Sequence, residues 1–279
     1  MKTVSFGRQQ RQVTLVGLGG EGVLRTYGRE TEARSVIRQA VDQGITYFDS
    51  ARVYSDSEVY YGSVWKEDPA LRESIFQTSK SASRSRSGAL ADLESTLKRL
   101  HTGYLDLWQI HDVRTEEDLL AISRPGGALE AFVEAKKSGL IRNIGVTGHH
   151  DPSVLTKAVQ EWPVDSVLLP VNPVEGLLGG FLTLTLPAAR KKRIAVIAMK
   201  ILGASHYILP KFGITPEILL RYALSFDVTV AIVGCSTPAE VQALAAAGAM
   251  PPLSEQERGE VTKIFAPYAD RMAFYRGVK

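Results

Sequence analysis

The sequence predicts a (β/α)8 barrel, and three observations support that fold class. Eight short apolar or β-branched runs recur along the 279 residues, and their starts lie about 31 residues apart, the length of one strand-plus-helix unit. These runs are apolar on both faces, as expected of parallel strands covered by helices. Several segments between them show the 3.6-residue apolar period of helices. A doubly wound open sheet is the alternative, because periodicity alone does not show that a sheet closes.

The predicted elements divide the chain into regular units. The strands cover residues 13–19, 45–51, 74–80, 105–111, 141–148, 166–172, 194–200 and 228–234. Apolar stripes at helical spacing occupy residues 33–41, 90–100 and 129–133, and each is followed by a glycine that can end a helix, at Gly44, Gly103 and Gly139. Thr215-Pro216 and Thr237-Pro238 each place a capping hydroxyl before a proline, which marks a helix start. Residues 181–192 carry a weaker helical pattern. Eight units account for nearly the whole length, so we expect one domain over residues 1–279.

Composition excludes several classes of function. Lysine and arginine total 33 against 30 for aspartate and glutamate, a formal charge of +3 that offers no electrostatic basis for binding nucleic acid or a membrane surface. Cys235 is the single cysteine, so no internal disulfide can form, which fits a reducing compartment. The start lacks a signal peptide's apolar core, and no apolar run approaches the ~18 residues of a membrane span. We expect a soluble cytoplasmic protein, a monomer or weak oligomer, with a small-molecule partner.

Four polar residues with complementary chemistry follow consecutive predicted strands. Asp49 ends the second strand and Tyr54 lies in the loop after it, Lys80 ends the third strand, and His111 ends the fourth. The carboxyl ends of barrel strands form the functional face of this fold. We therefore expect the four side chains to converge on one cavity.

This combination suits proton transfer to or from an oxygen atom. A tyrosine hydroxyl with a pKa of about 10 is a poor acid or base at neutral pH unless a cation lowers that pKa. We expect Lys80 to lower the pKa of Tyr54, Asp49 to keep the buried Lys80 charged, and His111 to orient a substrate carbonyl oxygen. Such chemistry accompanies hydride transfer at the adjoining carbon, and hydride requires a cofactor.

Two glycine-containing segments could contact a phosphate. Gly234, Ser236 and Thr237 lead from the last strand into a helix N-terminus, where barrels often bind phosphate, although an ordinary capped helix explains them too. Residues 17–22 match the G-x-G-x-x-G dinucleotide pattern, but no clean helix follows them. A tight turn at the barrel mouth explains the glycines of this second segment better.

Three motifs, taken together, resemble those of the aldo-keto reductases. Residues 48–54, Phe-Asp-Ser-Ala-Arg-Val-Tyr, followed by Ser57-Glu58 and Gly62, resemble that family's signature. Residues 77–80 are similar to its lysine strand and residues 105–111 to its histidine strand. The resemblance implies a (β/α)8 barrel and NAD(P)(H)-dependent interconversion of aldehydes or ketones with alcohols. It also implies that Tyr54 is the general acid in reduction, Lys80 and Asp49 its tuning pair, and His111 the substrate-orienting residue.

The resemblance also implies where a cofactor lies. Nicotinamide would lie near Asp49, Thr147 and Met199, and the adenosine phosphate end near residues 234–240. The further cofactor candidates are Gly148, Lys200, Leu202, Gly234, Ser236, Thr237 and Glu240. Thr147-Gly148 replaces the family's serine-asparagine pair, Leu168 its glutamine, and Met199-Lys200 the stacking tyrosine of many members. Lys200 either faces the diphosphate or simply ends its strand.

Cofactor choice and substrate are less defined by the sequence. NADP(H) is the family default, but Gly234 and Glu240 stand where members often place Lys and Arg around a 2′-phosphate. A carboxylate repels that phosphate and accepts hydrogen bonds from a free ribose hydroxyl, so NAD(H) is the alternative. The residues expected to line the substrate pocket are Tyr27, Trp108, His206 and Tyr207.

Two other functions are alternatives to the reductase. A metal-dependent hydrolase would use Asp49, His111, His149 and His150, but adjacent histidines on a strand point to opposite sides, so only one of His149 and His150 could share the site. We therefore expect no metal. A non-catalytic, cofactor-binding regulatory subunit is the other alternative, and the presence of all four catalytic residues argues against it.

Overall fold

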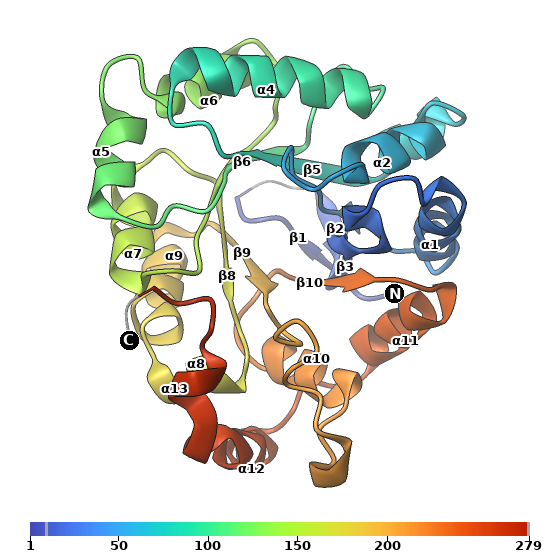
Figure 1. Ribbon diagram of the computed structural model, residues 1–279, viewed down its shortest axis with the longest axis vertical. Coiled ribbons are helices and arrows are strands. Elements are labelled where there is room, and N and C mark those ends of the chain that lie inside the picture. Colours follow the sequence, from blue (N-terminus) through green and yellow to red (C-terminus); the bar gives the residue numbers. More distant parts are fainter. Residues whose placement is uncertain (9–10, 278–279) are drawn as a thin grey trace.

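The computed structural model describes residues 1–8 and 11–277 and contains a closed barrel of eight parallel strands (Figure 1). Around the barrel the order is β10-β3-β4-β5-β6-β7-β8-β9. These strands are β3 (Val16–Gly22), β4 (Tyr47–Phe48), β5 (Phe76–Ser81), β6 (Leu107–Ile110), β7 (Ile144–Thr147), β8 (Ser166–Pro170), β9 (Ala195–Met199) and β10 (Val230–Cys235). The predicted barrel is confirmed, and the open-sheet alternative is wrong.

Helices surround the barrel and cover its outer face (Figure 1). They are α1 (Glu30–Asp42), α2 (Ser57–Trp65), α3 (Pro69–Ser74), α4 (Arg86–Arg99), α5 (Glu116–Ser123), α6 (Ala128–Lys137), α7 (Pro152–Glu161), α8 (Pro173–Leu178), α9 (Leu186–Lys192), α10 (Pro216–Leu224), α11 (Pro238–Ala249), α12 (Glu255–Phe265) and α13 (Ala269–Met272). Short helical turns are η1 (Val23–Arg25), η2 (Phe181–Thr185), η3 (Pro210–Phe212) and η4 (Ala266–Tyr268).

Local sequence signals account for several helix ends. The hydroxyls of Thr215 and Thr237 accept hydrogen bonds from the first turns of α10 and α11, as predicted. Gly44 and Gly139, just after α1 and α6, have φ values of 73° and 79°, a region that favours glycine. The weak helical pattern of residues 181–192 corresponds to η2, which has π-helical geometry, and α9.

An N-terminal hairpin, which the sequence did not predict, closes one end of the barrel. The predicted strand at 13–19 divides into β2 (Gln12–Thr14), which pairs antiparallel with β1 (Thr3–Ser5), and the barrel strand β3. Phe6, just after β1, packs on Phe76 with a centroid distance of 4.6 Å, and Tyr47 lies 5.3 Å from Phe76. These fully or almost fully buried rings form the barrel floor, so the opposite, carboxyl ends of the strands form the open mouth.

The outer helices leave no candidate membrane span within the described residues, because none of them is both long and apolar enough to cross a bilayer. The last helices, α12 and α13, pack against α8 (Figure 1). The chain beyond α13 then returns to the mouth of the barrel, where Tyr275 contacts residues that follow β7 and β8.

Candidate active site

Asp49 and Lys80 form a buried ion pair at the mouth of the barrel. Asp49 follows β4 and Lys80 lies near the end of the neighbouring strand β5. Side chains alternate across a strand, so Lys80 shares the inward face of β5 with Phe76 and Thr78. Lys80 Nζ lies 2.5 Å from Asp49 Oδ2 and donates to the carbonyl oxygen of Ser50 at 2.8 Å. Both charged residues are 1% exposed.

The Asp49 carboxylate is held by two further donors. Thr78 Oγ1 donates to Asp49 Oδ1 at 2.7 Å, and Gln109 Nε2 donates to the same oxygen at 3.3 Å. Buried charges persist only when they are paired and hydrogen-bonded. This network therefore fixes the position of the Lys80 ammonium group.

The Tyr54 ring lies against three charged or polar side chains. Its centroid is 5.6 Å from that of His111, with the rings edge to face. Lys80 Nζ and Arg25 Cζ each lie 4.8 Å from the same centroid. The structure thus brings the predicted catalytic residues Asp49, Tyr54, Lys80 and His111 together, and it adds Arg25.

The net shift of the Tyr54 pKa is opposite in direction to the one expected from Lys80. That pKa is raised well above its ordinary value, first by burial and then by the charges of Asp49 and Glu21, while Arg25 opposes the rise. Lys80 is not among the groups that dominate this shift, and its charge is paired with Asp49 at 2.5 Å. Tyr54 therefore stays protonated at neutral pH, the state in which a phenol can donate a proton.

His111 is neutral at ordinary pH. Its pKa is lowered to about 3, mainly by burial and then by the positive charge of Lys80. A neutral imidazole has one N–H donor and one acceptor nitrogen. Among the described residues, His111 Nδ1 is buried and has no hydrogen-bond partner. Buried polar atoms nearly always find one, so this nitrogen fits a hydrogen bond with a bound ligand or water.

A second polar cluster joins the chain after α13 to the residue beside His111. Asp112 Oδ1 lies 3.3 Å from His149 Nε2, and His149 Nδ1 lies 3.3 Å from the carbonyl oxygen of Tyr275. The Tyr275 hydroxyl donates to Glu175 at 2.8 Å. Sequence reasoning missed this cluster, because its members lie up to 163 positions apart in the printed sequence and share no motif.

The predicted nicotinamide residues lie at the ends of β7 and β9. The Thr147 hydroxyl accepts a hydrogen bond from the Asp112 amide at 2.8 Å. A Cβ at Gly148 would lie 2.9 Å from the carbonyl oxygen of Val113, so the backbone packs too closely there for a larger residue without a shift. Met199 contacts the apolar interior of the barrel.

Lys200 and Leu202 follow Met199 in a tight turn that is half-buried at both positions. Lys200 has a φ of 56°, an uncommon left-handed conformation for a residue with a side chain. Its carbonyl oxygen accepts a hydrogen bond from Asn172 Nδ2 at 3.1 Å. The turn is therefore fixed through its backbone at the rim of the mouth.

The end of β10 and the start of α11 form a closely packed cap. A Cβ at Gly234 would lie 2.7 Å from the backbone carbon of Glu21, so packing against β3 explains this glycine. The amide of Ser236 donates to the Glu240 carboxylate at 2.6 Å, and the amide of Glu240 donates to Thr237 Oγ1 at 3.3 Å. Side chains of the chain itself thus satisfy these two amides.

Two of the four predicted pocket residues are fully buried. Trp108 is fully buried and stacks on Phe132 of α6 with a centroid distance of 3.7 Å, because it lies on the outward face of β6. Tyr207 is also fully buried, and its hydroxyl donates to the carbonyl oxygen of Met272 at 2.9 Å. Their prediction as pocket-lining residues is wrong.

The other two pocket candidates are accessible. Tyr27 is 75% exposed, and the exposed ring of His206 lies 5.5 Å from the ring of Phe274. Their role in substrate binding stays a prediction.

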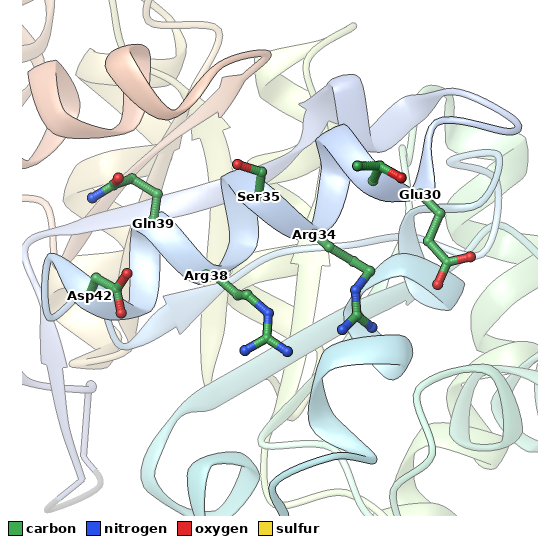
Figure 2. A pocket seen from close by; sticks show the side chains of 7 residues that line it. Glu30, Arg34, Ser35, Arg38, Gln39 and Asp42 are labelled. Carbon is green, nitrogen blue, oxygen red and sulfur yellow. The ribbon is translucent and has the colours of Figure 1, made fainter.

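A shallow polar hollow lies along α1, away from this site. Figure 2 shows its lining, which includes Arg34 and Arg38. Both guanidinium groups contact the Glu67 carboxylate, at 2.8 Å and 2.5 Å. Both arginines are therefore already ion-paired within the protein, and the hollow does not suggest a ligand site.

Comparisons with known proteins identify the family. The model of the Aldo/keto reductase family matches residues 15–207. This stretch contains the four predicted catalytic residues, Asp49, Tyr54, Lys80 and His111. The chain belongs to this family. Uncharacterized oxidoreductase YcsN of Bacillus subtilis (strain 168) is 30% identical to it over 190 residues, which cover 61% of this chain and 60% of that protein. Probable aldo-keto reductase 1 of Glycine max is 30% identical over 183 residues, covering 60% and 50%. The chain thus spans 50–60% of the length of these two relatives.

Solved aldo-keto reductases share the fold over nearly the whole chain. The holo form of aldo-keto reductase AKR11C1 from Bacillus halodurans superposes with a TM-score of 0.80 at 22% identity, covering 95% of this chain and 96% of that one. The thermostable aldo-keto reductase Tm1743 gives a TM-score of 0.76 at 24% identity, covering 95% and 100%. At these identities the likeness establishes the (β/α)8 barrel.

The residues considered for a metal-dependent hydrolase are arranged differently from a metal site in the part of the chain that the structure describes. Across residues 1–8 and 11–277, no group of three or more His, Cys, Asp or Glu side chains is arranged to hold a metal ion. Of the residues that a hydrolase would use, Asp49 is paired with Lys80, and His149 contacts Asp112. The family uses NAD(P)H, and the partnerless His111 Nδ1 at the mouth fits a site completed by a polar ligand.

Proposed function

We propose that the protein is an NAD(P)(H)-dependent oxidoreductase that interconverts aldehydes or ketones with alcohols. The observation that carries this proposal is the packing of Tyr54 against His111 and against the buried Lys80–Asp49 pair. One neutral phenol, one neutral imidazole and one fixed ammonium group meet at the open end of a barrel. Such a set can transfer a proton to a carbonyl oxygen and hold that oxygen in place.

Each residue has a distinct role in this proposal. In reduction, the protonated Tyr54 hydroxyl donates its proton to the substrate oxygen, and His111 donates a hydrogen bond that orients the same oxygen. Lys80 lies on the face of the Tyr54 ring and stabilises the phenolate left after proton transfer. Asp49 positions Lys80. A bound nicotinamide would supply or accept the hydride at the carbonyl carbon.

The cofactor would be held by residues along the rim of the mouth. We assign the nicotinamide end to the region of Asp49, Thr147 and Met199, and the adenosine end to residues 234–240. Glu240 supports a preference for NADH, because its carboxylate lies at the N-terminus of α11, where it occupies the Ser236 amide and would repel a 2′-phosphate.

A cofactor-oxidation assay tests the proposed function. The purified protein is expected to oxidise NADH or NADPH when 4-nitrobenzaldehyde is added, at a rate unchanged by EDTA. Loss of absorbance at the nicotinamide band measures turnover. Cofactor binding without turnover across a panel of carbonyl compounds would instead indicate a regulatory subunit, and chelator-sensitive hydrolysis would contradict the reductase.

Glu240→Arg is expected to shift cofactor preference toward NADPH by about tenfold or more in kcat/KM, because a charge that repels the 2′-phosphate becomes one that attracts it. The matched variant Glu240→Gln removes the charge but keeps an acceptor for the Ser236 amide. It should give a smaller shift in the same direction. An unchanged NADPH-to-NADH ratio in both variants would show that Glu240 does not face the 2′ position.

A further inference from the structure

Arg25 is a charged residue at the mouth that the proposed reaction does not use. It lies in η1, directly after β3, and its guanidinium carbon is 4.8 Å from the centroid of the Tyr54 ring. A cation within about 6 Å of a ring centroid interacts favourably with the ring face. Arg25 is thus the second cation, with Lys80, that contacts the predicted proton donor.

Two hydrogen bonds join the segment of Arg25 to the loop of Tyr54. Ser55, the residue after Tyr54, donates from its hydroxyl to the Arg25 carbonyl oxygen at 3.4 Å. The amide of Asp56 donates to the carbonyl oxygen of Thr26 at 3.2 Å. The segment that carries the guanidinium group and the loop that carries the phenol are therefore joined at two successive positions, which keeps the two backbones side by side.

The charge of Arg25 is available to a ligand. Its one side-chain hydrogen bond within the described residues runs from Nη1 to Glu21 Oε1 at 2.9 Å, which leaves the other guanidinium N–H groups for a second partner. The Arg25 and Glu21 side chains are 47% and 46% exposed. Exposed ion pairs stabilise a protein only weakly, so a ligand carboxylate can replace Glu21 at low cost.

The other carboxylates close to Tyr54 already have cationic partners. Asp49 is paired with Lys80 at 2.5 Å, and Asp112 with Arg114 at 2.6 Å. An anionic substrate that approaches the phenol therefore meets carboxylates that are already paired, and it meets the half-exposed guanidinium group of Arg25. Arginine recognises carboxylates with two parallel hydrogen bonds, which fixes their orientation as well as their position.

Building on the proposed function, we propose that Arg25 is a specificity-determining residue that selects carbonyl substrates bearing a carboxylate. The carboxylate binds the guanidinium group in place of Glu21, and the carbonyl oxygen then lies toward the Tyr54 hydroxyl. The substrate class is that of oxo acids and aldehyde acids. Glu21 acts as a competing internal carboxylate that neutral substrates need not displace.

Matched acids and esters test this inference. The probes are 4-formylbenzoate with its methyl ester and phenylglyoxylate with its methyl ester, which separate carboxylate and carbonyl by a long and a short spacing. The measured quantity is the acid-to-ester ratio of kcat/KM, so that any general effect of a variant on catalysis cancels. In the native enzyme, at least one acid should be preferred to its ester, and added NaCl should reduce this preference.

Variants of Arg25 and of its partner Glu21 test the inference directly. Arg25→Gln should lower the ratio about tenfold, mainly through KM for the acid, because a charge-assisted hydrogen bond is lost. Arg25→Lys should retain part of the preference, and Glu21→Gln should raise the ratio severalfold. If the ratio is unchanged in Arg25→Gln for both pairs while the esters are reduced, this inference is wrong and the proposed function stands. If no acid, ester or other carbonyl is reduced, the proposed function fails, and the inference fails with it.

Discussion

Tyr54→Phe is expected to lower kcat for carbonyl reduction by about 10²–10⁴-fold, the usual contribution of a positioned general acid. The substitution removes only the hydroxyl. The phenylalanine ring can keep the edge-to-face contact with His111 and the contact with Lys80. Steady-state kinetics measures the loss of turnover, and quenching of protein fluorescence by the cofactor measures binding, which should change less than about threefold.

Tyr222→Phe is the matched control for this experiment. Tyr222 is buried, whereas Tyr54 is partly buried, and the Tyr222 hydroxyl lies 3.1 Å from Thr262 Oγ1 between α10 and α12. Its loss should cost about 1 kcal/mol of stability without changing kcat. Native turnover in Tyr54→Phe would contradict the assignment of the proton donor, whereas equal losses in both variants would indicate a general effect on folding.

Asp49→Asn is expected to lower the free energy of unfolding by about 3–5 kcal/mol, because it leaves the Lys80 ammonium group buried without its counter-ion. The side chains have nearly the same shape, so the effect reports the charge. Chemical denaturation monitored by fluorescence measures the stability change. Carbonyl reduction should also fall, since the ammonium group beside Tyr54 loses the carboxylate that positions it.

An exposed ion pair provides the control for Asp49→Asn. Lys157 and Glu116 are also 2.5 Å apart, but their side chains are 49% and 53% exposed. Glu116→Gln should therefore change stability by less than about 1 kcal/mol. The double variant Asp49→Asn/Lys80→Met should recover much of the lost stability but not the activity. Equal effects at the buried and exposed pairs would show that burial does not strengthen the Asp49 interaction.

The positions of the catalytic candidates could be predicted because strand periodicity carries most of the information. Parallel strands place their carboxyl ends together, so Asp49, Lys80 and His111 had to meet if the barrel closed. The same rule could have excluded Trp108 from the pocket. It lies three positions before His111, and an odd separation places two strand residues on opposite faces.

Other features depend on contacts between distant parts of the chain. Tyr207 is buried, its hydroxyl donates to the carbonyl oxygen of Met272, 65 positions away, and nothing near Tyr207 in the sequence indicates that partner. The direction of the Tyr54 pKa shift depends on the balance of burial, cations and carboxylates in three dimensions. Composition and spacing name the charged residues but do not rank these opposing effects.

The aromatic floor of the barrel separates the region that stabilises the fold from the region that binds substrate. Phe6, Tyr47 and Phe76 fill the end opposite Tyr54. Substrate and product can therefore enter and leave the barrel only at its open end. The exposed residues around that end control the rates of substrate binding and product release. Substitutions in the floor can change the stability of the fold without changing substrate binding or product release. These two properties can therefore evolve at opposite ends of the same strands.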